Sequence, residues 1–345
     1  MKFNIHQIEL NTALQNLVRN TNTKFEQFSF IKLITKENNL ILQATNGEVS
    51  MECRLDVSMS DTDIILVNAR KFTDIVSRLS GVITFDNGII KAGKSKLKIE
   101  TKQDEGYSFV EHIEADSITL NIKELQTGIK NRLFACDTMS QNVLSGVCFD
   151  KDKIATCNGN MLAVYTLSEQ LPFDTVVLGN KLCQEILKCF DDETVQVSMT
   201  NNKVMLKSDK ITLIGRLLDG KYPKYRAIIP HHEHHATINK SLVINAIELL
   251  KLIDEKACTF NFDEDRLVIS VGDSNTEIDI KYSGVEMSIT FNSNYMINCL
   301  KNIDSEVIDF GFTDNKTGAT LSTDKELTLL MPILKKKLTL DTTKN

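Results

Sequence analysis

Apolar residues recur at helical spacing in six short stretches of the chain. In the first, apolar side chains stand at i, i+3, i+4, i+7 and i+8, which places them on one helix face: Leu10, Ala13, Leu14, Leu17 and Val18. Comparable stretches begin near Ala69, Ile122, Asn180, Ser241 and Asn292, at intervals of 51 to 61 residues. The pattern predicts six short amphipathic helices of about three turns each.

The segments between these helices alternate apolar and polar residues, which is the period of a β-strand with one buried face. Asn, Asp and Gly interrupt the alternation at short turns, so neighbouring strands are expected to form hairpins. The clearest examples are residues 28–44, 82–93, 195–208 and 258–271. Strands should therefore outnumber helices by several to one.

One helix followed by an antiparallel meander makes a unit that repeats six times along the chain. The units pair into three repeated domains, which predicts an α+β fold with large antiparallel sheets. Polar residues 114–117, and the run HHEHH at 231–235 after Pro230, are interpreted as breaks between domains. The predicted domains are residues 1–118, 119–236 and 237–345, with 336–345 as a flexible tail.

The composition fits an ordinary globular protein. The chain has 345 residues, of which 42% are hydrophobic and 25% charged, so it can bury a core without disulfides or metals. It contains no run of eighteen apolar residues and no long apolar segment near its start, so we expect a cytoplasmic protein. The eight cysteines form no CxxC pair, and we expect them to be reduced and buried as small apolar side chains.

The formal net charge is −6, so the molecule as a whole does not attract polyanions. Lysine and arginine nevertheless recur seven or eleven residues apart on the predicted helices, which places both members of a pair on one side. A positive stripe of this kind would attract duplex phosphates without reading sequence, and salt would weaken it. The predicted DNA-facing residues are Arg19, Lys24, Lys71, Arg78, Lys123, Lys130, Lys181, Lys188, Lys240, Lys251 and Lys301.

Two plainer observations bear on that prediction. Lysine on the solvated face of a single helix is ordinary, and only its repetition in corresponding places favours a binding role. The stripe has no aromatic residues among its cations, and the chain has no Trp, so stacking on single-stranded bases is not expected.

The chain carries no recognisable catalytic motif. It has no phosphate-binding loop, no dinucleotide fingerprint and no nucleophile elbow. In HHEHH, His232 and Glu233 are followed by Ala236 where an HExxH zinc motif needs its second histidine. We therefore expect no catalytic residues, no metal site and no cofactor, while a metal-dependent enzyme built on HHEHH remains an open alternative.

Six segments carry a resemblance to a known family, in order along nearly the whole chain. They are MKFNI at the start, VNARKFTDIV at 67–76, IATCNGNMLAVY at 154–165, RLLDGKYPKYRAIIP at 216–230, IKYSGVEMSITFNSNYMINCL at 280–300 and LLMPIL at 329–334. The chain resembles the bacterial DNA sliding clamp, the beta subunit of DNA polymerase III. The resemblance implies three domains of the DNA-clamp fold per chain, and a ring of two chains joined head to tail with helices lining the hole.

The resemblance also implies a mechanism and partners. A ring around double-stranded DNA would be a non-catalytic subunit of the polymerase holoenzyme, and would tether the polymerase to the primer end. The replicative polymerase, the clamp loader and repair proteins would bind through short peptide motifs, in a hydrophobic cleft between the second and third domains. The matching cleft positions are Leu144, Cys157, Gly159, Asn160, Met161, Leu162, Pro223, Ala227, Ile228, Leu329, Met331, Pro332, Ile333 and Leu334.

The alternative that a residue of this set belongs to the hydrophobic core is stronger for Leu162 and Ile228 than for Met161 and Met331. The sequence also departs from the family. Members often have His-Arg at Asn160-Met161, Arg at Ala227 and Arg-Leu at Leu334-Lys335, so this cleft should be less basic and more apolar. One hypothesis is that Leu338 and Leu340 in the tail fold back into the cleft as a weak competitor.

The family's ring contact joins the first domain of one chain to the third domain of the other. The matching apolar positions are Leu97 and Ile99 on an edge strand, and Leu252 and Ile253 at a helix end. Pairing two edge strands would also cover exposed sheet edges. A repeat scaffold that binds only proteins and never encloses DNA is the alternative, and the identity of the partners and the mode of ring opening stay open.

Overall fold

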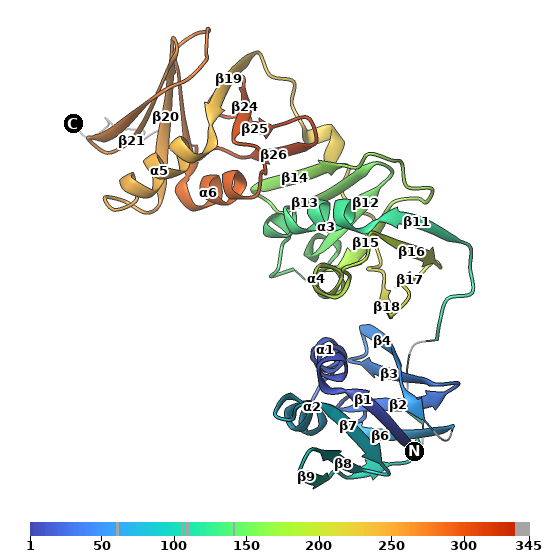
Figure 1. Ribbon diagram of the computed structural model, residues 1–345. Helices are drawn as coiled ribbons and strands as arrows, with labels where there is room; N and C mark the ends of the chain where they lie inside the picture. Colours follow the sequence, from blue (N-terminus) through green and yellow to red (C-terminus); the bar gives the residue numbers. More distant parts are fainter. Residues whose placement is uncertain (60–61, 105, 108, 110, 141, 335–345) are drawn as a thin grey trace, which may run out of the picture. The chain divides into compact units, whose positions relative to one another are not determined.

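The computed structural model describes residues 1–345 except 60–61, 105, 108, 110, 141 and 335–345 (Figure 1). Its helices confirm the six predicted stretches: α1 Gln7–Val18, α2 Ala69–Ser77, α3 Ile122–Lys130, α4 Asn180–Cys189, α5 Lys240–Leu250 and α6 Ser293–Lys301. Four short 3-10 helices also occur, at η1 Glu26–Phe28, η2 Leu133–Ala135, η3 Val143–Ser145 and η4 Tyr225–Ile228. The hypothesis about the tail, and Lys335, fall outside the described residues.

An asparagine directly precedes four of the described helices, which makes the repeat visible at single residues. The side chains of Asn68, Asn121, Asn239 and Asn292 each accept a hydrogen bond from a backbone N–H three residues on, at 2.9 to 3.0 Å. An asparagine in this position satisfies one of the free N–H groups at a helix start and stabilises it by about 1 kcal/mol.

The described chain forms two compact units, and the first contains residues 1–126 and 178–219. Its five-stranded sheet has the order β5 Ser58–Met59, β1 Lys2–His6, β7 Val82–Asp86, β8 Ile89–Ala92 and β9 Ser95–Lys98. Its nine-stranded sheet has the order β10 Thr101–Lys102, β6 Asp63–Asn68, β2 Phe30–Lys36, β3 Asn39–Thr45, β4 Val49–Asp56, β18 Ile211–Arg216, β17 Lys203–Lys207, β16 Thr194–Met199 and β11 Ser117–Asn121. The β4–β18 pairing makes one sheet from strands more than 150 residues apart.

The second unit contains residues 127–177 and 220–345. Its eight-stranded sheet has the order β15 Val176–Gly179, β12 Gly146–Asp150, β13 Lys153–Cys157, β14 Met161–Thr166, β26 Glu326–Leu330, β25 Ala319–Ser322, β24 Val307–Phe312 and β19 His234–Asn239. Its four-stranded sheet has the order β22 Ser274–Asp279, β21 Arg266–Val271, β20 Ala257–Asp263 and β23 Met287–Asn292. Neighbouring strands pair antiparallel, as the hairpin patterns predict.

All four predicted hairpins are confirmed, and their turns explain the residues found there. Glu37 and Asn38 between β2 and β3, and Asn87 and Gly88 between β7 and β8, have positive φ angles of 50°, 62°, 44° and 83°. Two consecutive residues in this region make the tight turn that fits the twist of paired strands. At Gly88 a side chain is also excluded by space, because a Cβ would lie 2.6 Å from the carbonyl oxygen of Ile99.

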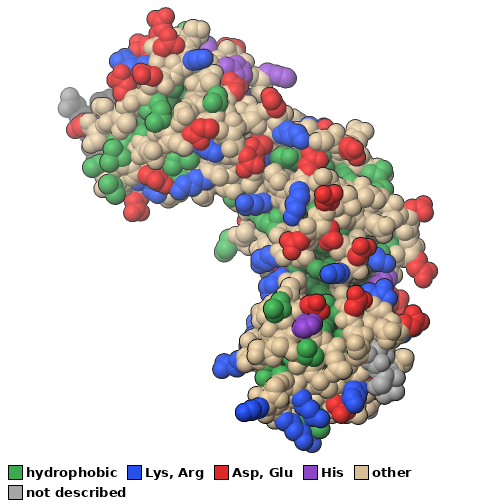
Figure 2. Space-filling view, viewed as in Figure 1, with side chains coloured by type: hydrophobic (Ala, Val, Ile, Leu, Met, Phe, Trp, Pro, Cys, Tyr) green, Lys and Arg blue, Asp and Glu red, His purple; other side chains and the backbone are tan. Residues whose placement is uncertain are grey.

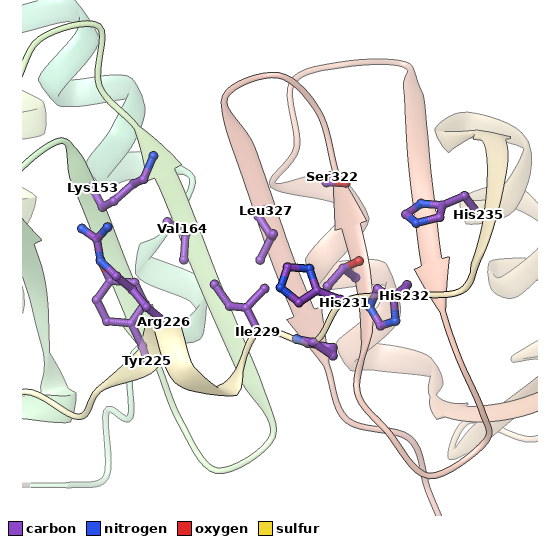
Figure 3. A pocket seen from close by; sticks show the side chains of 12 residues that line it. Lys153, Val164, Tyr225, Arg226, Ile229, His231, His232, His235, Ser322 and Leu327 are labelled. Atoms are coloured by element: carbon purple, nitrogen blue, oxygen red, sulfur yellow. The ribbon is translucent and has the colours of Figure 1, made fainter.

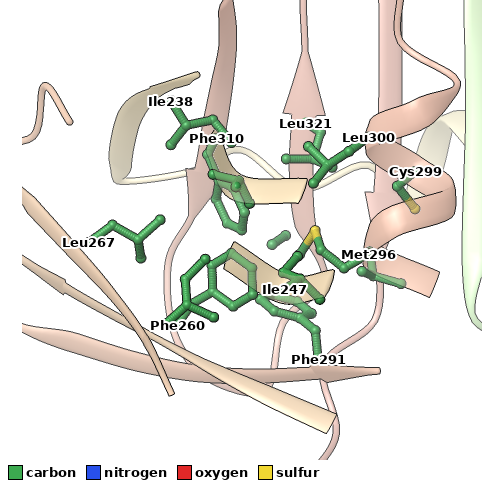
Figure 4. Packing of buried hydrophobic residues seen from close by; sticks show 14 of the residues in the cluster. Ile238, Ile247, Phe260, Leu267, Phe291, Met296, Cys299, Leu300, Phe310 and Leu321 are labelled. Carbon is green, nitrogen blue, oxygen red and sulfur yellow. The ribbon is translucent and has the colours of Figure 1, made fainter. Parts of the chain in front are cut away.

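A cluster of phenylalanines forms the centre of the second unit (Figure 4). Phe260 and Phe291 pack edge to face with ring centroids 5.5 Å apart, and Phe310 lies 5.9 Å from Phe260. Ile247 of α5 and Met296 of α6 cover the rings from the helix side. The apolar faces of helix and strand thus meet in one core, as the two periodicities predict.

One detail of the sequence interpretation is corrected. The run HHEHH is only partly a linker, because His234 and His235 belong to strand β19 and pair with Phe312 and Gly311. The predicted domain ends at residues 118 and 236 fall inside strands β11 and β19, and the division into residues 1–118, 119–236 and 237–345 stays a prediction. Both strands carry alternating patterns that polar flanks obscure in the sequence.

The eight cysteines are free and buried, as expected. Burial raises the pKa of the Cys136 and Cys148 thiols to about 12, which makes these two unreactive at neutral pH. Among the described residues, no helix has the length and apolar character needed to cross a membrane.

Candidate functional site

Three segments of the second unit meet at the turn Asn158–Asn160, which joins β13 to β14. The backbone N–H of Cys157 donates to the hydroxyl of Tyr222 at 3.0 Å, which ties the turn to the segment before η4. On the other side, the N–H of Met331 donates to the carbonyl oxygen of Asn160 at 2.9 Å. One hydrogen bond to a side chain and one between backbone groups thus connect the three segments that carry the predicted cleft residues.

Several predicted cleft residues expose large apolar side chains. Ile228, Met331, Ile333 and Leu334 are exposed, and the exposed fraction of Ile228 is 57%. Pro223, Ala227, Gly159 and Asn160 are also exposed, while Leu144 and Pro332 are half-buried. Large apolar side chains in water carry a free-energy cost that an apolar partner would remove.

The remaining four predicted cleft residues are buried: Cys157, Met161, Leu162 and Leu329. Met161 is 6% exposed and belongs to the core, where its sulfur lies 3.8 Å from that of Cys299 on α6. Leu162 and Leu329 face each other in the β14–β26 pair and are buried, as is Cys157. Met161 is thus a core residue and Ile228 a surface residue, the reverse of the expectation, because β14 is covered on both faces.

Tyr222 and Arg226 hold the segments that carry the exposed apolar residues, and neither was among the predicted cleft residues. Arg226 forms an ion pair with Asp150 at 2.9 Å, and the hydroxyl of Tyr225 donates to the same carboxylate at 3.0 Å. Burial raises the pKa of Asp150, but the hydrogen bonds from Tyr225 and Arg226 outweigh it and the net pKa is lowered. These contacts fix η4, which carries Ala227 and Ile228, and the only available signal was the tyrosine pair inside the 216–230 segment.

The predicted DNA-facing residues divide into two groups. Lys24, Lys71, Arg78, Lys123, Lys130 and Lys188 are exposed, and Lys181 is half-buried. The other four bind within the protein: Arg19 pairs with Glu185 at 3.3 Å and Lys301 with Glu248 at 2.7 Å, while Lys240 donates to the carbonyl of Ile303 and Lys251 to Asn294. The first group keeps its charge available at the surface. In the second group, carboxylates compensate Arg19 and Lys301, and neutral acceptors hold the ammonium groups of Lys240 and Lys251.

The cations of the first unit are not confined to its helices (Figure 2). Strands β8 and β9 and the turn between them carry Lys91, Lys94, Lys96 and Lys98, all exposed. Strand β9 is an edge of the five-stranded sheet. Four exposed lysines make this sheet edge positively charged and disfavour its unspecific pairing with other strands.

The predicted ring contact is only partly as expected. Leu97 on β9 is exposed, and Leu252 and Ile253 after α5 are exposed by 81% and 66%. Ile99 follows the end of β9 and is 5% exposed, with its N–H bonded to the carbonyl of Gly88. Ile99 is therefore not an edge-strand residue available for contact, because the chain turns inward one residue after the strand ends.

Within the described chain, no three His, Cys, Asp or Glu side chains are arranged to hold a metal ion. In the HHEHH run, His235 instead contacts Asp309 at 2.8 Å, and His234 packs on Phe312. Adjacent residues on a strand point to opposite faces, which separates their imidazoles.

Three family models match the chain in order. The N-terminal, central and C-terminal domains of the DNA polymerase III beta subunit match residues 1–111, 119–224 and 226–336. The chain belongs to the DNA polymerase III beta subunit family. The resemblance stated from the six segments is therefore confirmed, together with the three-domain α+β fold.

Curated relatives and solved structures of the family agree with this assignment. The beta sliding clamp of Streptococcus pneumoniae serotype 4 is 26% identical and aligns with 88% of this chain and 91% of its own length. That of Staphylococcus aureus is 25% identical over 90% and 93%. The structure of the Bacillus subtilis DNA polymerase sliding clamp has a TM-score of 0.90 at 20% identity, covering 97% and 100% of the two chains.

A further family structure was solved with a bound compound. The sliding clamp of Pseudomonas aeruginosa, bound to griselimycin, has a TM-score of 0.90 at 19% identity, with 97% of this chain and 100% of that chain covered. At this level of identity the likeness concerns the fold of the DNA polymerase III beta subunit family.

Proposed function

We propose that this chain is a sliding clamp, a processivity factor that encircles double-stranded DNA and tethers the replicative polymerase. The observation that carries the proposal is the match of all three family domains, in order, over residues 1–336. The relatives that cover most of the chain are named beta sliding clamps, which supports the same function.

The clamp acts by topology, without a catalytic group of its own. Two cytoplasmic copies close head to tail around the duplex, and the exposed cations of the helices contact phosphates without reading sequence. Because the ring cannot leave without opening, weak contacts that salt screens are sufficient and permit sliding. A tethered polymerase then has a high effective concentration at the primer end.

Two sheet edges support the head-to-tail contact. Strand β9 is the positively charged edge described above, and β22 is an edge of the four-stranded sheet that carries Glu277 and Asp279. Edges of opposite charge on the first and third domains attract each other between two copies, whereas two like edges repel. Leu97, Leu252 and Ile253 supply apolar contacts at the same interface.

Partner proteins bind through short peptides whose apolar side chains cover Ile228, Met331, Ile333 and Leu334. The replicative polymerase, the clamp loader and repair proteins would share this surface. The absence of arginine at Ala227 and of His-Arg at Asn160-Met161 makes it more apolar, so affinity here depends on buried apolar area more than on charge.

The decisive experiment separates a topological link from ordinary binding. The protein is incubated with nicked circular duplex, washed at high salt, and the retained fraction is compared before and after a single cut linearises the DNA. We expect retention on circles and release from linear ends. Equal retention on both, or none on either, contradicts enclosure, and the second result favours a scaffold that binds only proteins.

A companion variant addresses the HHEHH alternative. Replacing His231, His232, His234 and His235 with Gln should leave retention on circles unchanged, because the proposed ring uses none of these side chains. Loss of retention with intact folding, measured by circular dichroism, would contradict this account of the ring.

A further inference from the structure

A pocket of about 570 Å³ lies in the second unit beside the β14–β26 seam (Figure 3). Its apolar floor includes Val164 and Leu327, which face each other in the antiparallel register, and Ile229 flanks them. None of the predicted cleft residues lines it. The pocket is therefore a separate feature of the same unit.

The border of the pocket combines basic side chains with the hydroxyls of Tyr225, Thr320 and Ser322. Lys153 and Arg226 stand on one side and His231, His232 and His235 on the other, and no carboxylate occurs among the described lining residues. An apolar floor with a basic border is the usual composition of a site for an organic anion.

The two sides of the border differ in how far their charge is already compensated. Arg226 is paired with Asp150 at 2.9 Å, and Lys153 with Asp152 at 3.0 Å. On the histidine side, the only ion pair found among the described residues joins His235 to Asp309. The histidine side thus offers the less compensated donors to an incoming anion.

His232 contributes an unsatisfied hydrogen-bonding group to the pocket lining. Its Nδ1 lies 3.4 Å from the hydroxyl of Thr313, while its Nε2 is buried without a hydrogen-bond partner among the described residues. The ring is held against β24, because a Cβ at Gly311 would lie 2.6 Å from its Cδ2 atom. A buried ring nitrogen without a partner costs free energy, which an acceptor bound in the pocket would recover.

We propose that this pocket binds an amphipathic organic anion, a compound with an apolar body and one carboxylate or phosphate group. The apolar body covers Val164 and Leu327. An oxygen of the acid group accepts a hydrogen bond from Nε2 of His232, and the imidazole of His231 lies on the same border. A charge-assisted hydrogen bond of this kind is stronger than a neutral one.

Binding should be coupled to proton uptake. Burial and the neighbouring His235 lower the pKa of His232, which favours the neutral ring. A bound anion favours the protonated ring and raises this pKa, so affinity increases as the pH falls. The charged or titratable groups around the ring and along the border are His231, His235, Asp309, Lys153, Arg226, Asp150 and Asp152.

The test uses the full chain and phenylacetate as the probe, followed by nuclear magnetic resonance. Its carboxylate stays ionised at about pH 5.5 and about pH 8, so a change in affinity reports on the protein. We expect about tenfold tighter binding at the lower pH, the effect of one charge-assisted hydrogen bond. Phenyl phosphate and phenylacetate, compared at the higher pH, show which acid group is preferred.

Variants isolate the role of His232. His232→Phe keeps the ring packing and should lose both the affinity gain and its pH dependence, whereas His232→Gln keeps a donor and should lose only the pH dependence. His6→Phe, in the first unit, is the matched control and should bind as the parent does. Neutral 2-phenylethanol binding as tightly as phenylacetate, or unchanged binding by His232→Phe, would overturn the proposal.

Discussion

At the scale of single residues, the most constrained contact is the buried ion pair of Arg132 and Glu326 in the second unit. The two side chains meet at 2.7 Å, and Arg132 also donates to the carbonyls of Val164 and Asn302. The second oxygen of Glu326 accepts the N–H of Asp304 at 2.9 Å. Burial lowers the pKa of Arg132, although Glu326 acts in the opposite direction. The pair thus joins the central and C-terminal domains through a fully hydrogen-bonded charge.

Removing one partner of this pair should strongly lower the free energy of unfolding. Glu326→Ala leaves a buried guanidinium without its carboxylate, so we expect a loss of about 3–5 kcal/mol in the free energy of unfolding. Urea unfolding followed by circular dichroism measures it. The matched control is Glu248→Ala, which breaks the exposed pair with Lys301 and should cost no more than about 1 kcal/mol. Equal effects of the two changes would contradict this account.

Single residues are also where the sequence predicted least. From the sequence, Arg132 would be predicted to lie at the surface, as most arginines do. Its neighbours in the sequence do not indicate that a carboxylate nearly 200 residues away is buried against it. For the same reason the sequence does not show that Met161 is buried and Ile228 exposed. Met161 is buried because it contacts Cys299 of α6, whereas Ile228 is exposed at the end of η4, and both outcomes depend on contacts between distant segments.

At the scale of elements, the sequence predicted the fold well. Six helical stripes and four hairpins were recognisable because their periods of 3.6 and 2 are local properties. The pairings β4–β18 and β14–β26 were not predicted, since strands from different domains join edges that carry no local signal. The candidate cleft lies beside the β14–β26 pairing. Its segments could be predicted from the family resemblance, but the exposure of their side chains is seen only in the structure.

The exposed residues of the cleft give a prediction at this scale. Ile228→Asp and Leu334→Asp should each weaken binding of a labelled peptide from the cognate polymerase by about tenfold or more, because an apolar anchor is worth roughly 1.5–3 kcal/mol. Fluorescence anisotropy measures the change. Val307→Asp alters a comparably exposed residue on β24 and should bind normally. A similar loss in all three variants would mean that the effect is not specific to the cleft.

At the scale of the whole molecule, function depends on two copies closing a ring, and the proposed contact has both charge and apolar terms. Lys96 on β9 and Glu277 on β22 stand on edges of opposite sign, and Leu252 and Ile253 are highly exposed in the single chain. Leu252→Lys combined with Ile253→Lys should therefore give monomers, as measured by sedimentation velocity. It should also abolish retention on circular DNA, since a chain that cannot close a ring cannot enclose a duplex.

Charge reversal then tests which edges meet. Lys96→Glu and Glu277→Lys should each weaken the dimer by placing like charges in contact, and the double variant should recover much of the loss, because the pair is restored in reverse. The recovery should decrease at high salt, which screens exposed charges. Ile8→Lys, a change on the exposed face of α1 outside the proposed contact, is the control and should remain dimeric. If the charge-reversed double variant is no better than the single ones, β9 and β22 are not partners across the ring.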